Sequence, residues 1–233
     1  PVFDANANAG GSLGALPEWD LRALYTAPDA PELPRDLSWL EKECAAFAAD
    51  YEGRLATLDA DAMLACIRRN ERISAVAGRV MSFAGLRYYQ NTLDAARAKF
   101  MSDCQEKITD FTTPLVFFSL EFNRIEDDRY QALFGANADI ARYKPVFDRM
   151  RALRPHQLSD ELEKFLHDQS TVGAAAWNKL FDETMAGLEF NVEGYEGAMN
   201  LEATLDLLSE QDRATREKGA RALAAVFGQN VKL

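Results

Sequence analysis

The chain has 233 residues, of which 48% are hydrophobic and 27% are charged, a composition typical of a globular protein rather than a disordered or membrane-embedded one. Its net charge of -11 argues against nucleic-acid binding and against attachment to anionic membranes, because phosphate groups repel an acidic surface. No uninterrupted apolar run approaches the roughly 18 residues that span a bilayer.

Residues 1–15 predict a flexible tail, because PVFDANANAGGSLGA is rich in Ala, Asn and Gly and lacks the basic start and apolar run of an intact signal peptide. The three cysteines, Cys44, Cys66 and Cys104, are far apart and form no C-x-x-C pair. This spacing favours buried, reduced thiols in a cytoplasmic protein over a disulfide framework or a zinc ribbon.

Residues 16–25 are the first stretch predicted to be structured, and Asp20 within it can cap a short helix. A proline-rich link follows, and Ser38 with Glu41 forms the pattern of a capping box at the start of a long helix. One apolar stripe of that helix runs from Leu40 to Leu55 at spacings of three and four.

Asp59 is expected to cap the next helix, which extends to about Tyr89. Gly78 and Gly85 lie inside it and lower its helix propensity. We therefore expect another helix to approach closely at both glycines.

A helix beginning at Thr92 carries a seam of apolar residues from Met101 to Ile125. The pattern fits either a coiled-coil partner or a helix of an intrachain bundle, and matching stripes on neighbouring segments favour the bundle. Pro114 lies inside the seam and should kink the helix.

A short helix is predicted over residues 128–134, ended by Gly135. The next helix, which carries Ile140, Phe147 and Leu153 on one face, must stop near Pro155.

The stretch RPHQLSDELEKFLHDQS contains both histidines, His156 and His167, among several carboxylates. A zinc helix of the H-E-x-x-H kind needs histidines four residues apart, whereas these are eleven apart and neither precedes a glutamate. Ser159 is a good N-cap for a helix whose apolar face is Leu162, Phe165 and Leu166, with His167 on its polar side. The stretch is therefore interpreted as a structural helix start, with no metal.

The helix after it carries Trp177 and Phe181 and can end at Gly187. Residues 188–201 alternate between apolar and polar and contain two glycines, which predicts one small β-hairpin. An amphipathic helix is expected from Ser209 onward.

These elements predict an all-α fold, an array of long antiparallel helices with that single hairpin. The sequence contains no Walker, dinucleotide-binding or G-x-S-x-G motif, and no spacing supports a carboxylate acid–base pair.

Read in order, several stretches resemble the amino-terminal half of the oligoendopeptidase F family, zinc metallopeptidases related to thimet oligopeptidase. Their number, order and spacing carry the resemblance, which covers nearly everything after Leu16. The matching stretches are LPEWDLRALY, FAADYEGRL, LVFFSLEFNRI, RPHQLSDELEKFL, AAAWNKLFDE, LEFNV and LLSEQDRATREKGARAL.

The resemblance implies a mostly helical enzyme whose cleft admits short, unstructured peptides and excludes folded proteins. The family's H-E-x-x-H helix and third zinc ligand match no position here, so no catalytic residue, cofactor-binding residue or metal ligand is assigned. We expect residues 16–208 to form the amino-terminal lobe and residues 209–233 to begin the helix that leads into a catalytic lobe absent from this chain. By this interpretation the chain alone is inactive, and zinc and peptide substrates belong to the full-length protein.

Two other hypotheses remain. A stand-alone helical interaction module would explain the seam and the lack of a catalytic constellation. A small-molecule enzyme that uses carboxylates finds no supporting spacing. If a catalytic lobe is missing, one face should expose more apolar surface than a monomer tolerates, and a homo-oligomer could form through that face.

Overall fold

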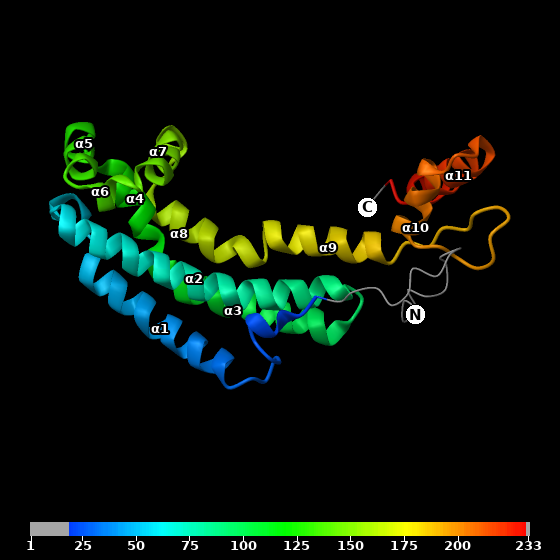
Figure 1. Cartoon of the computed structure of the whole chain (residues 1–233), viewed down its shortest axis with the longest axis horizontal. Coiled ribbons are helices and arrows are strands. Elements are labelled where there is room, and N and C mark those ends of the chain that lie inside the picture. Colours follow the sequence, from blue (N-terminus) through cyan, green and yellow to red (C-terminus); the bar gives the residue numbers. More distant parts are fainter. Residues whose placement is uncertain (1–18, 232–233) are drawn as a thin grey trace.

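The computed structural model describes residues 19–231, in which most helices are joined by short turns and a longer loop connects α9 to α10 (Figure 1). The α-helices are α1 (Glu32–Tyr51), α2 (Ala60–Gln90), α3 (Ala95–Thr112), α4 (Val116–Arg124), α5 (Asp127–Gly135), α6 (Ala138–Ala141), α7 (Lys144–Ala152), α8 (Asp160–Asp168), α9 (Ala174–Ala186), α10 (Leu201–Asp206) and α11 (Arg213–Gln229). Short 3-10 helices are η1 (Leu21–Ala23), η2 (Leu55–Thr57), η3 (Thr113–Leu115), η4 (Arg154–His156), η5 (Gln169–Thr171) and η6 (Leu207–Ser209). The all-α prediction is confirmed, whereas the predicted flexible tail over residues 1–15 lies outside the described residues.

Helices α1, α2 and α3 form an antiparallel array of three long helices, as Figure 1 shows. The seam on α3 and α4 packs within the chain, since Cys104, Phe118 and Phe122 are buried in its cores. The predicted kink at Pro114 is a full division, because η3 separates α3 from α4 there.

The start of α1 was predicted wrongly. The helix begins at Glu32 rather than beside Ser38, which is exposed in the middle of α1. Pro34 lies in the first turn, where a missing N–H has no intrahelical partner to lose, so the proline-rich link runs into the helix instead of preceding it. Leu33 and Leu37 are buried and extend the apolar stripe back to that start.

Asp59 caps α2 as predicted, with its Oδ1 accepting from the N–H of Ala62 at 2.8 Å. The predicted close approach at Gly78 is wrong, because a Cβ there would meet nothing within 4 Å. At Gly85 the side chain of Met101 on α3 lies 4.0 Å from that position, an ordinary contact.

The single helix predicted from Ile140 to Leu153 is divided into α6 and α7. Pro145 lies in the first turn of α7. Its missing N–H cannot continue a preceding helix, so a new helix begins there.

No strand occurs among the described residues, so the predicted hairpin over residues 188–201 is wrong. Only one isolated antiparallel bridge is present, between Phe190 and Met199, with N–O distances of 2.8 and 2.9 Å. Gly194 and Gly197 have positive φ and turn the chain, and Asn200 then caps α10. The alternating pattern thus reflects a short extended segment that pairs at one point and buries Phe190.

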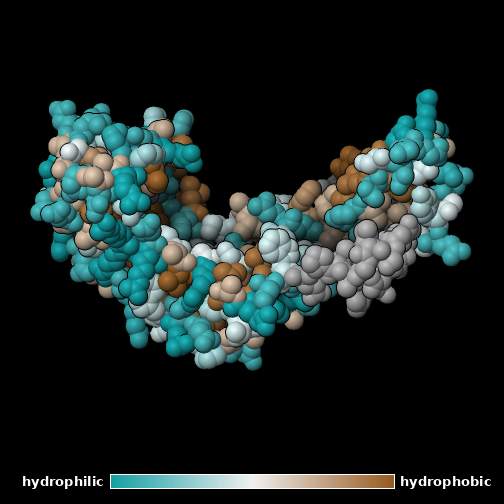
Figure 2. Space-filling view, in the orientation of Figure 1, coloured by the Kyte–Doolittle hydropathy of each residue, from teal (hydrophilic) through white to brown (hydrophobic). Residues whose placement is uncertain are grey.

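The molecule is elongated, and its space-filling surface is hollowed between α5–α7 at one end and α10–α11 at the other (Figures 1 and 2). Helices α8 and α9 run along the floor of this hollow. None of the described helices is long and apolar enough to cross a membrane.

Candidate functional site

Helix α8 begins as the sequence predicts. The Ser159 side chain accepts from the backbone N–H of Leu162, and Glu163 Oε1 accepts from the N–H of Leu158 at 2.9 Å. Both N–H groups would otherwise have no intrahelical partner, so these bonds fix where the helix begins.

The polar side of α8, rather than its apolar side, packs on the rest of the chain. Asp160 forms an ion pair with Arg124, and Lys164 Nζ lies 3.3 Å from Glu52 Oε1. His167 lies on the polar side, as predicted, and this side is half-buried there, with His167 Nε2 3.2 Å from Thr112 Oγ1.

The apolar side chains of α8 therefore face solvent. Phe165 is 57% exposed, and Leu162 and Leu166 are equally open. Helical geometry places them opposite the side that carries Asp160, Lys164 and His167.

Helix α9 repeats this arrangement. Lys179 points inward and donates to Ser102 Oγ on α3 at 3.2 Å, whereas Trp177 is 70% exposed on the opposite side. We call the exposed apolar side of both helices the α8–α9 apolar face; its members are Leu162, Phe165, Leu166, Val172, Trp177, Leu180 and Phe181. Large exposed apolar side chains gathered on one side of two successive helices are typical of an interaction site.

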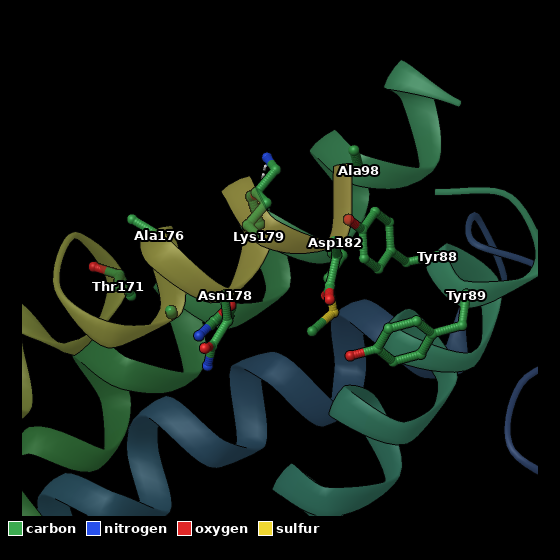
Figure 3. Close-up of a pocket in the computed structure, with 12 residues that line it drawn as sticks. Tyr88, Tyr89, Ala98, Thr171, Ala176, Asn178, Lys179 and Asp182 are labelled. Carbon is green, nitrogen blue, oxygen red and sulfur yellow. Dashed lines mark hydrogen bonds between the residues drawn. The ribbon is translucent and has the colours of Figure 1, made fainter. Parts of the chain in front are cut away.

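A cavity of about 400 Å³ lies on the inner side of α9, between that helix, the end of α2 and the start of α3 (Figure 3). Tyr88, Tyr89 and Met101 contribute apolar surface, and Lys179 and Asp182 contribute charge. Nothing in the sequence indicated this pocket, because its residues come from α2, α3, η5 and α9, which are brought together by packing.

Tyr88 is the unusual residue of this pocket. It is 4% exposed, and its hydroxyl has no hydrogen-bond partner among the described residues. Burial raises the pKa of the Tyr88 phenol, and the nearby negative charges of Glu183 and Asp182 raise it further. The phenol is therefore neutral and able to donate or accept a hydrogen bond.

The two histidines lie in different surroundings. His156 is exposed in η4, and His167 is docked on α3. Residues 19–231 contain no group of three or more His, Cys, Asp or Glu side chains that could hold a metal ion.

The cysteines are buried and free, as predicted. Burial raises the pKa of the Cys44 thiol to about 11 and that of Cys66 to about 12. Such thiols are poor nucleophiles at neutral pH and are structural residues.

Comparison with known proteins places these features in context. A family model described as oligopeptidase F matches residues 121–190. Oligopeptidase PepF of Bacillus subtilis is 22% identical over 84% of this chain and 30% of its own length. Group B oligopeptidase PepB of Streptococcus agalactiae is 23% identical over 65% of this chain and 26% of its own length.

A crystal structure of oligoendopeptidase-F from Enterococcus faecium superposes on 85% of this chain with a TM-score of 0.69 and 20% identity, and the match covers 40% of that structure. The chain spans less than a third of the length of PepF and of PepB, the two curated relatives named above. Together the comparisons confirm that the chain resembles the amino-terminal half of the oligoendopeptidase F family.

Proposed function

We propose that this chain is the amino-terminal lobe of a zinc-dependent oligoendopeptidase that hydrolyses short peptides in the cytoplasm. The lobe forms a wall and cap of the substrate cleft and restricts substrates by size. It contributes no catalytic residue and no zinc ligand and is inactive alone, and residues 209–233 lead toward the catalytic lobe.

The observation that carries this proposal is the orientation of α8 and α9. Burying Phe165 or Trp177 would favour folding, yet both helices bind the rest of the chain through charged and polar side chains. Such an orientation is expected where further polypeptide covers the apolar face. The related proteins are three to four times longer than the matched region, so they contain enough additional chain to do so.

The described residues do not fit zinc, since they contain no group of candidate ligands. Zinc chemistry is therefore assigned to the remainder of the longer protein, and no catalytic step is derived for the residues of this chain.

The test uses the full-length protein, purified with its metal and assayed on short fluorogenic peptides, with a folded protein as the negative substrate. We expect cleavage of the peptides alone and loss of activity on chelation. In the same protein, a double substitution of Phe165→Asp and Phe181→Asp should abolish cleavage by displacing the catalytic lobe. The matched control Val146→Asp changes an equally exposed residue on α7 and should leave cleavage unchanged.

The alternative is a stand-alone helical interaction module, which the same apolar face would also serve. A native protein of 26.0 kDa without zinc and without peptidase activity would favour this alternative. Association of two copies through the face remains a prediction, and light scattering of the isolated chain tests it.

A further inference from the structure

The pocket on the inner side of α9 has the composition of a ligand site rather than of a packing defect. An empty apolar cavity carries no polar group in need of a partner. This one is lined by Tyr88, whose buried hydroxyl has no hydrogen-bond partner among the described residues. Leaving a buried hydroxyl unpaired destabilises the folded chain, so a bound group that pairs with it has an energetic advantage.

The charge of the pocket indicates the sign of that group. Asp182 lines the pocket and has no ion-pair or hydrogen-bond partner within residues 19–231, and its negative charge acts on Tyr88 together with that of Glu183. Lys179 is the one cation in the lining. Its ammonium is directed to Ser102 and lies 3.9 Å from Glu183, so it is already paired. In Figure 3 it points away from Asp182.

The aromatic residues indicate the shape of the group. The rings of Tyr88 and Tyr89 lie 5.3 Å apart with an interplanar angle of 53°, which makes two walls of an aromatic corner. Figure 3 shows both rings extending from α2 toward α9, where the side chain of Asp182 points toward them. Aromatic faces beside a carboxylate attract an organic cation, and the Met101 side chain provides apolar contact for its alkyl part.

We propose that this pocket binds an organic ammonium group, with Asp182 as the counter-ion and Tyr88 and Tyr89 as an aromatic and hydroxyl wall. The ammonium donates to the Asp182 carboxylate and to the Tyr88 hydroxyl oxygen. Two sources share this chemistry, a lysine side chain and the α-amino group of a peptide. The proposal does not rest on the proposed function, because it concerns binding alone.

The test is a titration of the chain, labelled with ¹³C at its methionine methyl groups, with n-butylammonium chloride. Of the six methionines, Met101 alone lines the pocket, so its methyl resonance should shift while that of the buried Met63 stays unchanged. The neutral analogue 1-butanol should not reproduce this shift.

Asp182→Asn should weaken n-butylammonium binding by about tenfold or more, since it removes a charge-assisted hydrogen bond. The matched control is Asp110→Asn, which changes net charge equally at an exposed position of α3 outside the pocket, and it should bind like the wild type. Tyr88→Phe should also weaken binding while folding normally, because it deletes a hydroxyl that has no partner among the described residues.

Equal binding of n-butylammonium by the wild-type chain and both pocket variants, or no shift at Met101, would overturn the proposal.

Once n-butylammonium binding is established, competition distinguishes the two sources of the ammonium group. Displacement by N-acetyl-lysine methylamide identifies a side-chain ammonium, and displacement by an alanine dipeptide amide with a free amino terminus identifies an α-ammonium.

Discussion

Arg124 on α4 binds Asp160 in the first turn of α8, with Nη1 3.0 Å from Oδ2, and so attaches the charged side of α8 to the rest of the chain. The pairing also lowers the pKa of the Asp160 carboxyl. Both side chains are half-exposed, so this single ion pair contributes little to stability. The ion pair matters because it fixes which side of α8 faces the rest of the chain, and this orientation leaves Phe165 facing solvent.

Phe165→Ser in the isolated chain should change the free energy of unfolding by less than about 0.5 kcal/mol, because an exposed side chain loses little on truncation. Phe122→Ala is the contrasting core variant: Phe122 is fully buried and stacks on Phe147 with ring centroids 4.1 Å apart. It should lower the free energy of unfolding by about 3–5 kcal/mol. Urea denaturation followed by circular dichroism measures both. A large loss of stability in Phe165→Ser would mean that α8 buries its apolar side in solution.

Arg151 makes several polar contacts in the helical end formed by α4–α7. Its side chain is 10% exposed, donates to the carbonyls of Phe122 and Ile125 at 3.1 and 2.8 Å, and pairs with Asp127. Its guanidinium also lies 4.5 Å from the ring centre of Tyr130. The residue thus adds donors at the end of α4, where the Phe122 carbonyl also accepts from the N–H of Ile125 at 3.2 Å.

Arg151→Met should lower the free energy of unfolding by about 2–4 kcal/mol, because it keeps the aliphatic volume but removes these donors. Arg221→Met is the control. Arg221 forms an exposed i,i+4 pair with Glu217 on α11, and its substitution should have a negligible effect in the same urea titration. Equal stability of the two variants would show that the carbonyl contacts of Arg151 are unimportant.

Local features were predictable from the sequence where they depend on neighbouring residues. The caps at Asp59 and Ser159 were predicted correctly, and Pro114 was identified as an irregularity although a kink was expected instead of a division. Each follows from hydrogen bonding within one or two turns. The prediction that α1 begins at Ser38 was wrong because the capping-box pattern can also occur inside a helix. Here the apolar stripe continues upstream to Leu33.

Features that depend on distant residues were not predictable. Periodicity identified the apolar side of α8 but could not show whether this chain covers it. The same limit applies to the pocket, where Tyr88 and Asp182 are separated by more than ninety residues and meet only through packing. The alternation around Phe190 was misread for a related reason. Period two indicates an extended chain, whereas a strand needs several consecutive paired residues, and here only Phe190 and Met199 pair.

The buried thiols predict a loss of stability at alkaline pH. The folded-state pKa values of Cys44 and Cys66, about 11 and 12, lie above the ordinary value of 9.0, so folding favours the neutral thiols. Their contribution is complete below pH 9 and is lost as the pH rises toward 11 and 12, because the unfolded chain then releases its protons first. Burial likewise raises the pKa of Tyr25 to about 12, with the same sign. The urea concentration at the midpoint of unfolding should therefore decrease when the pH is raised from 8 to 10.5.

Thiol accessibility tests the same burial independently. The three cysteines should react with a chromogenic disulfide reagent at pH 8 only after urea is added. Ser38→Cys provides an exposed thiol on α1 as a positive control and should react on mixing. Rapid reaction of the native thiols without urea would show that the α1–α2 core opens readily.

Two glycine substitutions should change stability in opposite directions. At Gly78, in the middle of α2, an added Cβ meets open space, so Gly78→Ala should raise the free energy of unfolding by about 0.5–1 kcal/mol through helix propensity.

At Gly219 on α11, the added Cβ would lie 3.0 Å from Leu207 Cβ and 3.3 Å from the Thr204 carbonyl oxygen. Overpacking at this contact, which costs about 1–3 kcal/mol, should outweigh the gain in propensity, so Gly219→Ala should destabilise the α10–α11 contact. Hydrogen exchange of the α11 amides should accelerate in Gly219→Ala and stay unchanged in Gly78→Ala. Unchanged exchange in both variants would mean that α11 does not pack on Leu207 as closely as the structure shows.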